Sequence, residues 1–360
     1  MAGSQRFTIG WIDPHSMVIS TRSDLMTPPA LHLAQRARDA MAMGGPRLLM
    51  LSIALYEEAV RLAPRDPDLR RELAWAYHKN AMYGQARDAI GAAVALAPDL
   101  YRSQLHACVM NLQAVYESQT SLETAADRYA SDLDALLHAT RRASQEELTA
   151  CAKGYGVPLP FQLPYLGFDI RPQQELFGEI IGRISAAYFA RPYPARLARD
   201  RAARRRRIRI GFAFALFYSH SSWHVALKGW LKALDPETFE LIGYNLSSRC
   251  DGETEVARGL LAKMVDGPRT LRSWVELIEA DELDVLIYPE LGMWWHVMLL
   301  ASLRLAPVQC TGWGHFVTSG LPTIDYFLTG DLAEPVNAAR HYTETLVRLP
   351  NLSVTYEPQT

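Results

Sequence analysis

A 34-residue period between residues 56 and 98 limits how this chain can fold more than any other feature does. Two sets of five positions, 34 residues apart, match in residue type: Tyr56, Ala59, Leu62, Ala63 and Pro64, then Ile90, Ala93, Leu96, Ala97 and Pro98. Small residues allow two antiparallel helices to approach closely, and the large residues fill the groove between neighbouring repeats. Each proline ends the second helix of its pair, because proline cannot continue a helix. The period therefore predicts stacked helical hairpins.

The spacing within one period indicates which repeat this is. Large, small, aromatic and small residues follow one another at the spacing of a tetratricopeptide repeat, namely Leu73, Ala74, Tyr77 and Ala86. Outside residues 30–100 the pattern fades, since Asp39 and Asn111 stand where Leu73 and Tyr77 would recur, but helical periodicity continues from Leu105 to Leu137. We predict an all-α repeat region over residues 1–150; an unrelated pair of helical hairpins is the alternative.

A proline-rich and arginine-rich stretch follows. Residues 153–172 hold several glycines and four prolines, Gly154 and Gly156 among them, which favour an extended connection, and helix is expected from Gln173 to Ala190. From Arg191 to Arg209 there are nine arginines and one aspartate. This excess could bind nucleic acid or an anionic membrane. No aromatic residue interleaves with Arg204 to Arg207 for base stacking, so we favour a solvated linker that ends in a strand. Residues 151–206 together are predicted to be a helical and extended linker.

Beyond residue 207 the pattern changes to alternating strands and helices. The expected strands are Ile208–Phe214, Phe239–Leu246, Val285–Tyr288, Val308–Gly312 and Tyr326–Thr329. Between them we expect helices at Trp223–Leu234, Glu253–Lys263, Thr270–Ala280 and Val297–Leu305. This alternation predicts a parallel, doubly wound, Rossmann-like lobe over residues 207–360. Such sheets bind ligands at the carboxyl ends of their strands.

The loop after the first expected strand carries two histidines four residues apart. His220, Ser221 and His224 stand at the start of the next helix, where free backbone N–H groups and imidazoles would face the crevice. These groups suit a phosphate or a developing oxyanion, and a neutral imidazole there could act as a general base. A helix-capping serine with structural histidines is the alternative.

Two further loops carry polar residues and glycines. Glu290 and Gly292 follow the Val285–Tyr288 strand, with Trp294 and Trp295 just beyond. The carboxylate could orient a sugar hydroxyl or a histidine, and the tryptophans could stack on a sugar ring. The alternative is that the carboxylate caps a helix and the two tryptophans face the core. The loop after Val308–Gly312 adds glycines for close backbone approach and three polar contacts: Gly314, His315, Thr318, Ser319 and Gly320.

Several classes of protein are excluded or disfavoured. The chain has no GxGxxG dinucleotide fingerprint, no HExxH or carboxylate–histidine metal cluster and no GxSxG hydrolase elbow. Its net charge of −2 disfavours a globally basic nucleic-acid binder. The longest strongly apolar stretch, Leu291 to Leu303, is short of the roughly 18 residues of a membrane span, and no secretory signal is visible. The four scattered cysteines suit a reducing compartment, so we expect a cytoplasmic protein. Because the metal-binding motifs are missing, we expect no metal.

Three strings in the C-terminal half resemble one known family. They are Leu303 to Gln309, Trp313 to Tyr326 and Tyr342 to Pro350, and the strand Arg207 to Phe212 and the segment His220 to His224 fit the same region. Over residues 150–358 the chain resembles the O-linked N-acetylglucosamine transferase family, and within it the bacterial SPINDLY-like branch, with kinship to the adhesin N-glycosyltransferases. The upstream repeats fit the layout of that family.

The resemblance implies a GT-B glycosyltransferase of two lobes. Such an enzyme moves a sugar from a UDP-sugar, here UDP-N-acetylglucosamine, to a protein side chain with inversion, and its repeats present the acceptor polypeptide. It implies no metal or other cofactor. His220 matches the histidine discussed as the base near the acceptor, and the loop from Gly314 to Gly320 matches the glycine-rich loop of the cleft.

The same resemblance implies that a part of the enzyme is missing. Residues 208–360 suffice for one Rossmann half, and the chain stops where the family crosses into its donor-binding lobe, so we expect no activity from these 360 residues alone. Hydrophobic residues also replace the family's usual ones at Leu216, Phe316 and the Trp294–Trp295 pair. A repeat-containing scaffold with a degenerate, non-catalytic lobe is the alternative function. The oligomeric state, the acceptor, the donor sugar and the choice between O- and N-linkage stay open.

Overall fold

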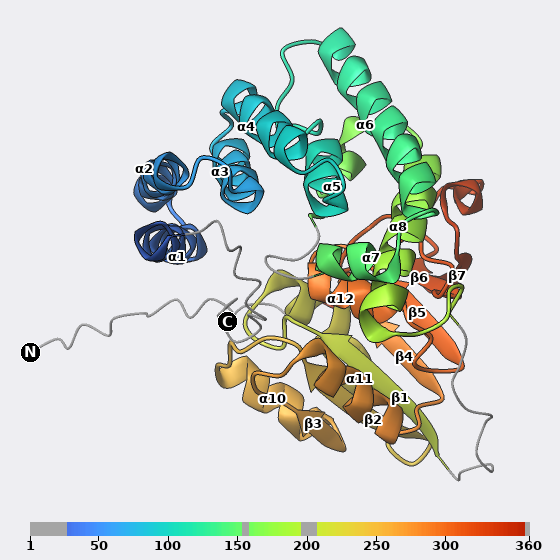
Figure 1. Cartoon of the computed structure of the whole chain (residues 1–360). Helices are drawn as coiled ribbons and strands as arrows, with labels where there is room; N and C mark the ends of the chain where they lie inside the picture. The colour runs from blue at the N-terminus through green and yellow to red at the C-terminus, as the bar shows by residue number, and fades with distance from the viewer. Residues whose placement is uncertain (1–26, 153–157, 196–206, 357–360) are drawn as a thin grey trace, which may run out of the picture. The chain divides into compact units, whose positions relative to one another are not determined.

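The computed structural model describes residues 27–152, 158–195 and 207–356. The chain divides into two compact units between Pro98 and Asp99, and each is described by itself. The predicted boundaries, 1–150, 151–206 and 207–360, stay predictions. In the structure the helices from residue 101 onward belong to the same compact unit as the sheet (Figure 1).

The described part of the first unit, residues 27–98, forms two helical hairpins. Its helices are α1 (Pro28–Met43), α2 (Pro46–Leu62), α3 (Pro67–Lys79) and α4 (Tyr83–Leu96). Helix α1 packs on α2, α2 on α3, and α3 on α4. Proline occupies the first position of the first three helices, where its missing N–H costs no helical hydrogen bond. The structure thus confirms the predicted stack of hairpins, with α2 and α4 ending just before Pro64 and Pro98.

Small buried residues and one ion pair hold these hairpins together. Ala34, Ala37 and Ala59 are fully buried beside Tyr56 in one hydrophobic cluster. Arg38 on α1 donates from Nε and Nη2 to both carboxylate oxygens of Glu72 on α3, at 3.1 and 3.2 Å. Because these residues are one repeat apart, the bidentate pair joins equivalent positions of successive repeats.

The second unit begins with helices and continues into the sheet. The helices are α5 (Tyr101–Val109), α6 (Gln119–Thr140), α7 (Gln145–Ala152) and α8 (Arg171–Phe189), with a 3-10 turn at Leu163–Leu166. Helix α8, expected from Gln173, starts two residues earlier and packs against α6, α7 and α12. The interpretation of residues 196–206 as a solvated linker lies outside the described residues. Arg191, before that stretch, forms a bidentate pair with Glu279.

Seven parallel strands form a single sheet in the order β3-β2-β1-β4-β5-β6-β7. They are β1 (Ile208–Phe214), β2 (Phe239–Asn245), β3 (Lys263–Val265), β4 (Val285–Tyr288), β5 (Val308–Gly312), β6 (Tyr326–Gly330) and β7 (Thr345–Leu349). All six pairings are parallel, which confirms the predicted fold class (Figure 1). Strands β3 and β7 were not predicted, and the helix expected through Lys263 ends at Leu260.

The connecting segments cover the sheet. They are a π-helical turn η3 (Ser222–Leu227), α9 (Lys228–Ala233), α10 (Gly252–Leu260), α11 (Leu271–Ala280), α12 (Trp295–Ala301) and η4 (Ala338–His341). Helix α12 therefore ends four residues before the predicted Leu305. None of the helices in the described ranges is both long and apolar enough to span a membrane.

A hydrophobic core of the described residues lies between β1 and the helices that follow it. Phe212 and Phe214 point to one face of the sheet and pack in one cluster with Trp223 and Leu227. Gly211, which alternates with them, faces the other side, because a Cβ there would lie 2.4 Å from Leu283. This packing fixes where β1 ends, and so where the loop that carries His220 begins.

Candidate functional site

The strand order of the sheet identifies the place where a ligand would bind. β1 lies between β2 and β4, so the connections on its two sides run in opposite directions along the sheet. In doubly wound sheets the ligand crevice lies outside the carboxyl ends of the strands at such a reversal. The loops 215–221 and 289–294, which follow β1 and β4, border this point, and the loop after β5 is next to them. All three predicted loops therefore lie along one edge of the sheet.

Glu290 connects two of these loops inside the protein. Its side chain is fully buried, and Oε1 accepts a 2.6 Å hydrogen bond from the backbone N–H of Ala215. Burial raises the pKa of the carboxyl to about 8, although the Ala215 hydrogen bond acts in the opposite direction. Oε2 is buried without a hydrogen-bond partner among the described residues. At pH 7 the side chain is therefore neutral, and it holds the β4 loop against the β1 loop.

His220 is half-buried, and its ring is held by the backbone of its own loop. Nδ1 accepts a hydrogen bond from the backbone N–H of Ser222 at 3.1 Å. A nitrogen that accepts a hydrogen bond carries no proton, so the neutral imidazole carries its proton on Nε2. Burial lowers the pKa of His220, and the positive charge of Arg249 and the nearby His224 lower it further. The ring is therefore a neutral hydrogen-bond donor through Nε2.

The other predicted residues of this loop are also placed. Nε2 of His224 lies 3.3 Å from Oγ of Ser219. Ser221 is exposed and makes no side-chain capping hydrogen bond, unlike the capping serine considered above. The backbone N–H of Ser219 donates to Oδ2 of Asp251 at 2.9 Å, which ties the β1 loop to the loop after β2. His220, Ser221 and His224 thus share one braced and partly accessible segment.

The glycines of the third loop allow close contacts within the protein. The N–H of Gly314 donates to the carbonyl of Pro289 at 2.8 Å, and a Cβ on Gly314 would lie 2.4 Å from that oxygen. Gly320 has φ +68°, and its Cβ would lie 1.9 Å from the carbonyl oxygen of Gln174 on α8. We expected these glycines to allow close approach to a ligand. At these two positions the backbone instead closely approaches the β4 loop and α8.

Thr318 and Ser319 donate to a carboxylate that the sequence reasoning did not single out. Glu344, just before β7, is buried; Oε2 accepts from the Thr318 hydroxyl at 2.7 Å, and Oε1 accepts from the Ser319 N–H at 2.8 Å. The Ser319 hydroxyl also donates to Oε1. Both hydroxyls are thus engaged inside the protein. The only sequence signal for Glu344 was its place in the string from Tyr342 to Pro350.

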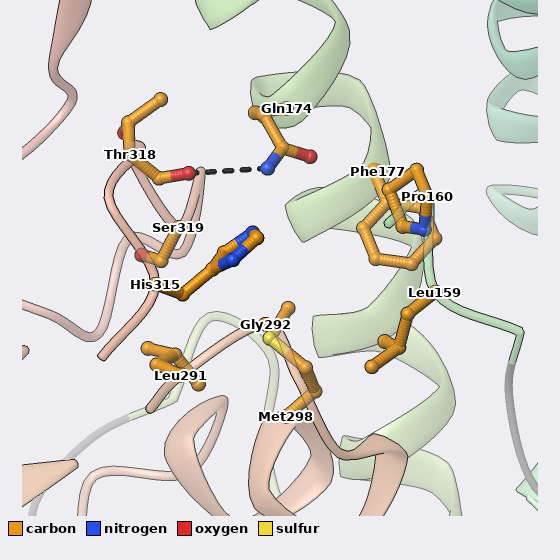
Figure 2. A pocket seen from close by; sticks show the side chains of 10 residues that line it. All are labelled: Leu159, Pro160, Gln174, Phe177, Leu291, Gly292, Met298, His315, Thr318 and Ser319. Carbon is orange, nitrogen blue, oxygen red and sulfur yellow. Dashed lines mark hydrogen bonds between the residues drawn. The ribbon is translucent and has the colours of Figure 1, made fainter. Parts of the chain in front are cut away.

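His315 lies against a small cavity beneath α8. Figure 2 shows its imidazole between Gln174, which donates to the carbonyl of Thr318 at 3.1 Å, and the backbone of Gly292. A Cβ on Gly292 would lie 2.5 Å from the His315 ring. Phe161 stacks on the imidazole at 5.9 Å, and burial lowers the pKa of His315 to about 4.

The cavity itself has room for about one water molecule, with about 10 Å³ of space. Its walls combine apolar and polar residues: Leu159, Pro160, Gln174, Phe177, Leu291, Gly292, Met298, His315, Thr318 and Ser319 (Figure 2). A sugar ring does not fit into this space. Within the described ranges, no hydrogen bond or ring contact joins this group to His220.

Aromatic side chains also lie in the loops at the carboxyl ends of the strands. Trp294 packs against the hydrophobic cluster that contains Phe212 and Phe214, and its Nε1 is buried without a partner among the described residues. Trp295 lies edge-on to His296. The guanidinium of Arg249 lies 4.2 Å over the ring of Tyr218 in the β1 loop. Sequence reasoning missed Arg249; a lone basic residue shortly after a predicted strand end was its only signal. In the described ranges, no three His, Cys, Asp or Glu side chains gather as a metal-ligand group.

Comparisons with known proteins agree with the sequence motifs. No known protein-family profile matches the chain. It is 29% identical, over 154 residues, to the probable UDP-N-acetylglucosamine–peptide N-acetylglucosaminyltransferase SPINDLY of Solanum lycopersicum; the match covers 41% of this chain and 16% of that protein. The protein of the same name from Eustoma exaltatum subsp. russellianum is 30% identical over 129 residues, which are 34% of this chain and 14% of that protein.

A solved structure extends the likeness to nearly the whole chain. An O-GlcNAc transferase mutant from Thermobaculum terrenum matches with a TM-score of 0.56 and 22% identity, over 93% of this chain and 59% of that one. This likeness shows the fold, and the curated relatives confirm the predicted resemblance to O-linked N-acetylglucosamine transferases of the SPINDLY type. The chain spans less than a fifth of the length of the curated relatives that it matches.

Proposed function

We propose that this chain supplies the helical repeats and the first Rossmann lobe of a UDP-sugar-dependent protein glycosyltransferase. The observation that supports it best is the reversal of strand order at β1, where a braced loop presents His220 half-exposed at the mouth of the crevice. The donor would be UDP-N-acetylglucosamine, because the names of the SPINDLY relatives include this sugar nucleotide. Transfer to the polypeptide side chain would proceed with inversion. The helical repeats would bind the acceptor polypeptide.

The predicted site residues divide into two groups by exposure. Those at the surface of the crevice, His220, Ser221 and His224, would touch the ligand. The others would hold the loops in place, because their polar atoms or close contacts are directed into the protein: Glu290, Gly292, Gly314, His315, Thr318, Ser319 and Gly320. No metal is part of this proposal. The four cysteines are free thiols, and we propose a cytoplasmic location.

The hydrogen bond to His220 supports a role as an orienting donor over a role as general base. With Nδ1 accepting from Ser222, Nε2 carries a proton and can donate to an oxygen of the acceptor or donor. To accept the proton of the acceptor hydroxyl at Nε2, the ring would first have to give up the Ser222 hydrogen bond. We therefore propose that His220 orients an oxygen atom and does not serve as the base.

The enzyme hypothesis is tested by transfer and binding together. The 360-residue chain and, where the reading frame continues beyond Thr360, the longer product are incubated with UDP-N-acetylglucosamine and a library of Ser-, Thr- and Asn-containing peptides. We expect peptide mass shifts and thermal stabilisation by the donor only with the longer form, since the resemblance places the donor contacts in a second lobe. If the longer form shows neither, the enzyme proposal is wrong.

Two substitutions in the longer form test the role of His220. Glutamine at this position offers an N–H donor close to the place of Nε2 but cannot take up a proton, whereas alanine offers neither. We expect His220→Gln to keep a substantial part of the transfer rate and His220→Ala to lose it. Equal loss in both variants would instead indicate a base. His138→Gln, at an exposed position on α6, is the control and should transfer at the unchanged rate.

The small cavity favours the alternative function, a scaffold with a non-catalytic lobe. Its space of about 10 Å³ is far too small for a sugar, although four of the predicted cleft residues line it: Gly292, His315, Thr318 and Ser319. A scaffold would still bind polypeptides through α1–α4. The same experiment separates the two functions, because a scaffold would capture peptides without any mass shift in either form.

A further inference from the structure

An arginine without a carboxylate partner lies beside His220. The guanidinium of Arg249, in the loop after β2, lies 4.2 Å over the ring of Tyr218 and is half-buried. Its backbone N–H is bonded to the Ser247 hydroxyl, and among the described residues no carboxylate forms an ion pair with its side chain. A partly desolvated guanidinium has five N–H donors, and its usual partner is a carboxylate or a phosphate.

The neighbouring acidic groups are already engaged. Asp251 accepts from three backbone N–H groups, those of Ser219, Glu253 and Thr254. Oε2 of Glu253 accepts from Nε1 of Trp223 and from the ammonium group of Lys228. Asp251 therefore joins the two loops, and Glu253 joins α10 to the segment that follows the β1 loop. Arg249 thus stands next to engaged carboxylates, and no ion pair within the described ranges neutralises its positive charge.

The same tyrosine also contacts His220. The ring centroid of His220 is 6.0 Å from that of Tyr218, with the two rings nearly perpendicular. The Ser222 hydrogen bond makes Nε2 a donor, and the positive charge of Arg249 is close enough to lower the pKa of the ring. The imidazole of His220 and the guanidinium of Arg249 therefore both contact Tyr218, on two loops that the Ser219–Asp251 hydrogen bond holds together.

We propose that Arg249 and His220 form a subsite for an anionic group, a phosphate or a carboxylate, with Tyr218 holding the guanidinium in place. The proposal rests on the proposed function, since it names a charged group on one of that enzyme's ligands. Two sources share this chemistry: the diphosphate of the nucleotide sugar and an acidic side chain of the acceptor polypeptide. Charge-assisted hydrogen bonds from a planar guanidinium and an imidazole N–H suit both.

Binding of simple anions to the 360-residue chain tests this subsite without any transfer reaction. The His220 ring nitrogens are followed by NMR at constant ionic strength while inorganic pyrophosphate, a glutamate-rich peptide or its glutamine counterpart is added. We expect at least one of the two anions to shift the Nε2 resonance and to raise the pKa of His220, because a nearby negative charge favours the imidazolium. The glutamine peptide should have neither effect.

Two arginine variants decide whether Arg249 is responsible. Arg249→Gln should weaken anion binding by about tenfold or more, and Arg249→Lys, which keeps the charge but loses the planar donor pair, by less. The matched control is Arg183→Gln on α8, because that guanidinium also lies over a tyrosine, at 4.8 Å from Tyr193. Circular dichroism checks that every variant is folded.

The outcomes separate the sources and the two proposals. Binding of pyrophosphate alone assigns the subsite to the diphosphate of the donor, and binding of the acidic peptide alone assigns it to the acceptor. If neither anion moves the His220 resonance, or if Arg249→Gln binds anions as tightly as Arg183→Gln, the subsite is refuted. An absence of sugar transfer would contradict the proposed function but leave the measured anion binding as it is.

Discussion

Replacement of Glu290 by glutamine tests whether a neutral carboxyl holds the β1 and β4 loops together. The side chain is fully buried, and Oε1 accepts a hydrogen bond from the Ala215 N–H at 2.6 Å. Burial raises its pKa from the ordinary 4.5 to about 8. Glutamine keeps the shape and an acceptor for Ala215 but cannot ionise at any pH. The substitution therefore removes only the titration.

The expected magnitude follows from the two pKa values. Between pH 4.5 and pH 8 the folded chain holds a proton on Glu290 that the unfolded chain has released, so the folded state loses stability as the pH rises. The penalty on the free energy of unfolding is about 1 kcal/mol at pH 5, about 3 kcal/mol at pH 7 and about 5 kcal/mol at pH 9. The Glu290→Gln variant should show no such penalty.

Urea unfolding at a series of pH values measures this difference. Tryptophan fluorescence is a suitable signal, since most tryptophans of the chain, from Trp223 to Trp313, lie in the unit that contains the sheet. The free energy of unfolding of Glu290→Gln minus that of the unaltered chain should increase by about 2 to 3 kcal/mol between pH 5 and pH 7. Other titrating groups cancel in this difference.

A control and a refuting result complete the test. Glu255→Gln on α10 replaces an exposed glutamate that pairs with Arg258, and such exposed pairs contribute at most about 1 kcal/mol. Its difference curve should therefore stay nearly flat with pH. If the Glu290→Gln curve is equally flat, the carboxyl is ionised in the folded state and the reasoning from burial is wrong.

Two further substitutions test the packing of the loop and of the repeats. Gly320→Ala should lower the free energy of unfolding by at least about 2 kcal/mol, because φ is +68° and the new Cβ would lie 1.9 Å from the Gln174 carbonyl oxygen. Urea unfolding measures this loss, with Gly252→Ala as the control because nothing lies within 4 Å of a Cβ there. Equal effects of the two substitutions would contradict this account. Asp66→Ala should cost about 1 to 2 kcal/mol in a thermal melt followed by circular dichroism, since the N-cap carboxylate accepts from Leu69 N–H at 3.0 Å; an unchanged melt would show that the cap contributes nothing.

The sequence predicted the strands at the centre of the sheet better than those at its edges. The predicted bounds of β1, β4 and β5 agree with the structure, because most residues of these central parallel strands are buried. The edge strands β3 and β7 were missed. β3 has only three residues and starts with the exposed Lys263, and exposed or half-buried residues make up β7. Partly solvated strands leave a weaker pattern in the sequence.

Residue types in the loops predicted the location of the site but not the internal partners. Thr318 and Ser319 are polar residues at a strand end, as expected, yet Glu344 accepts their hydrogen bonds from 25 to 26 residues away. Gly320 was expected to face a ligand, and its contact is with Gln174 on α8. Contacts between segments far apart in the chain have no local periodicity, so no spacing rule can reveal them.

The sequence by itself determined the repeated hairpins, the parallel sheet and the edge at which the polar loops gather. These follow from patterns of 34, 3.6 and 2 residues that express local geometry and one-sided burial. Only the tertiary structure decided which nitrogen of His220 carries the proton, that Glu290 is neutral, and that Arg249 lies over Tyr218. Protonation depends on burial and on the charges nearby, and both are set by segments that meet only when the chain is folded.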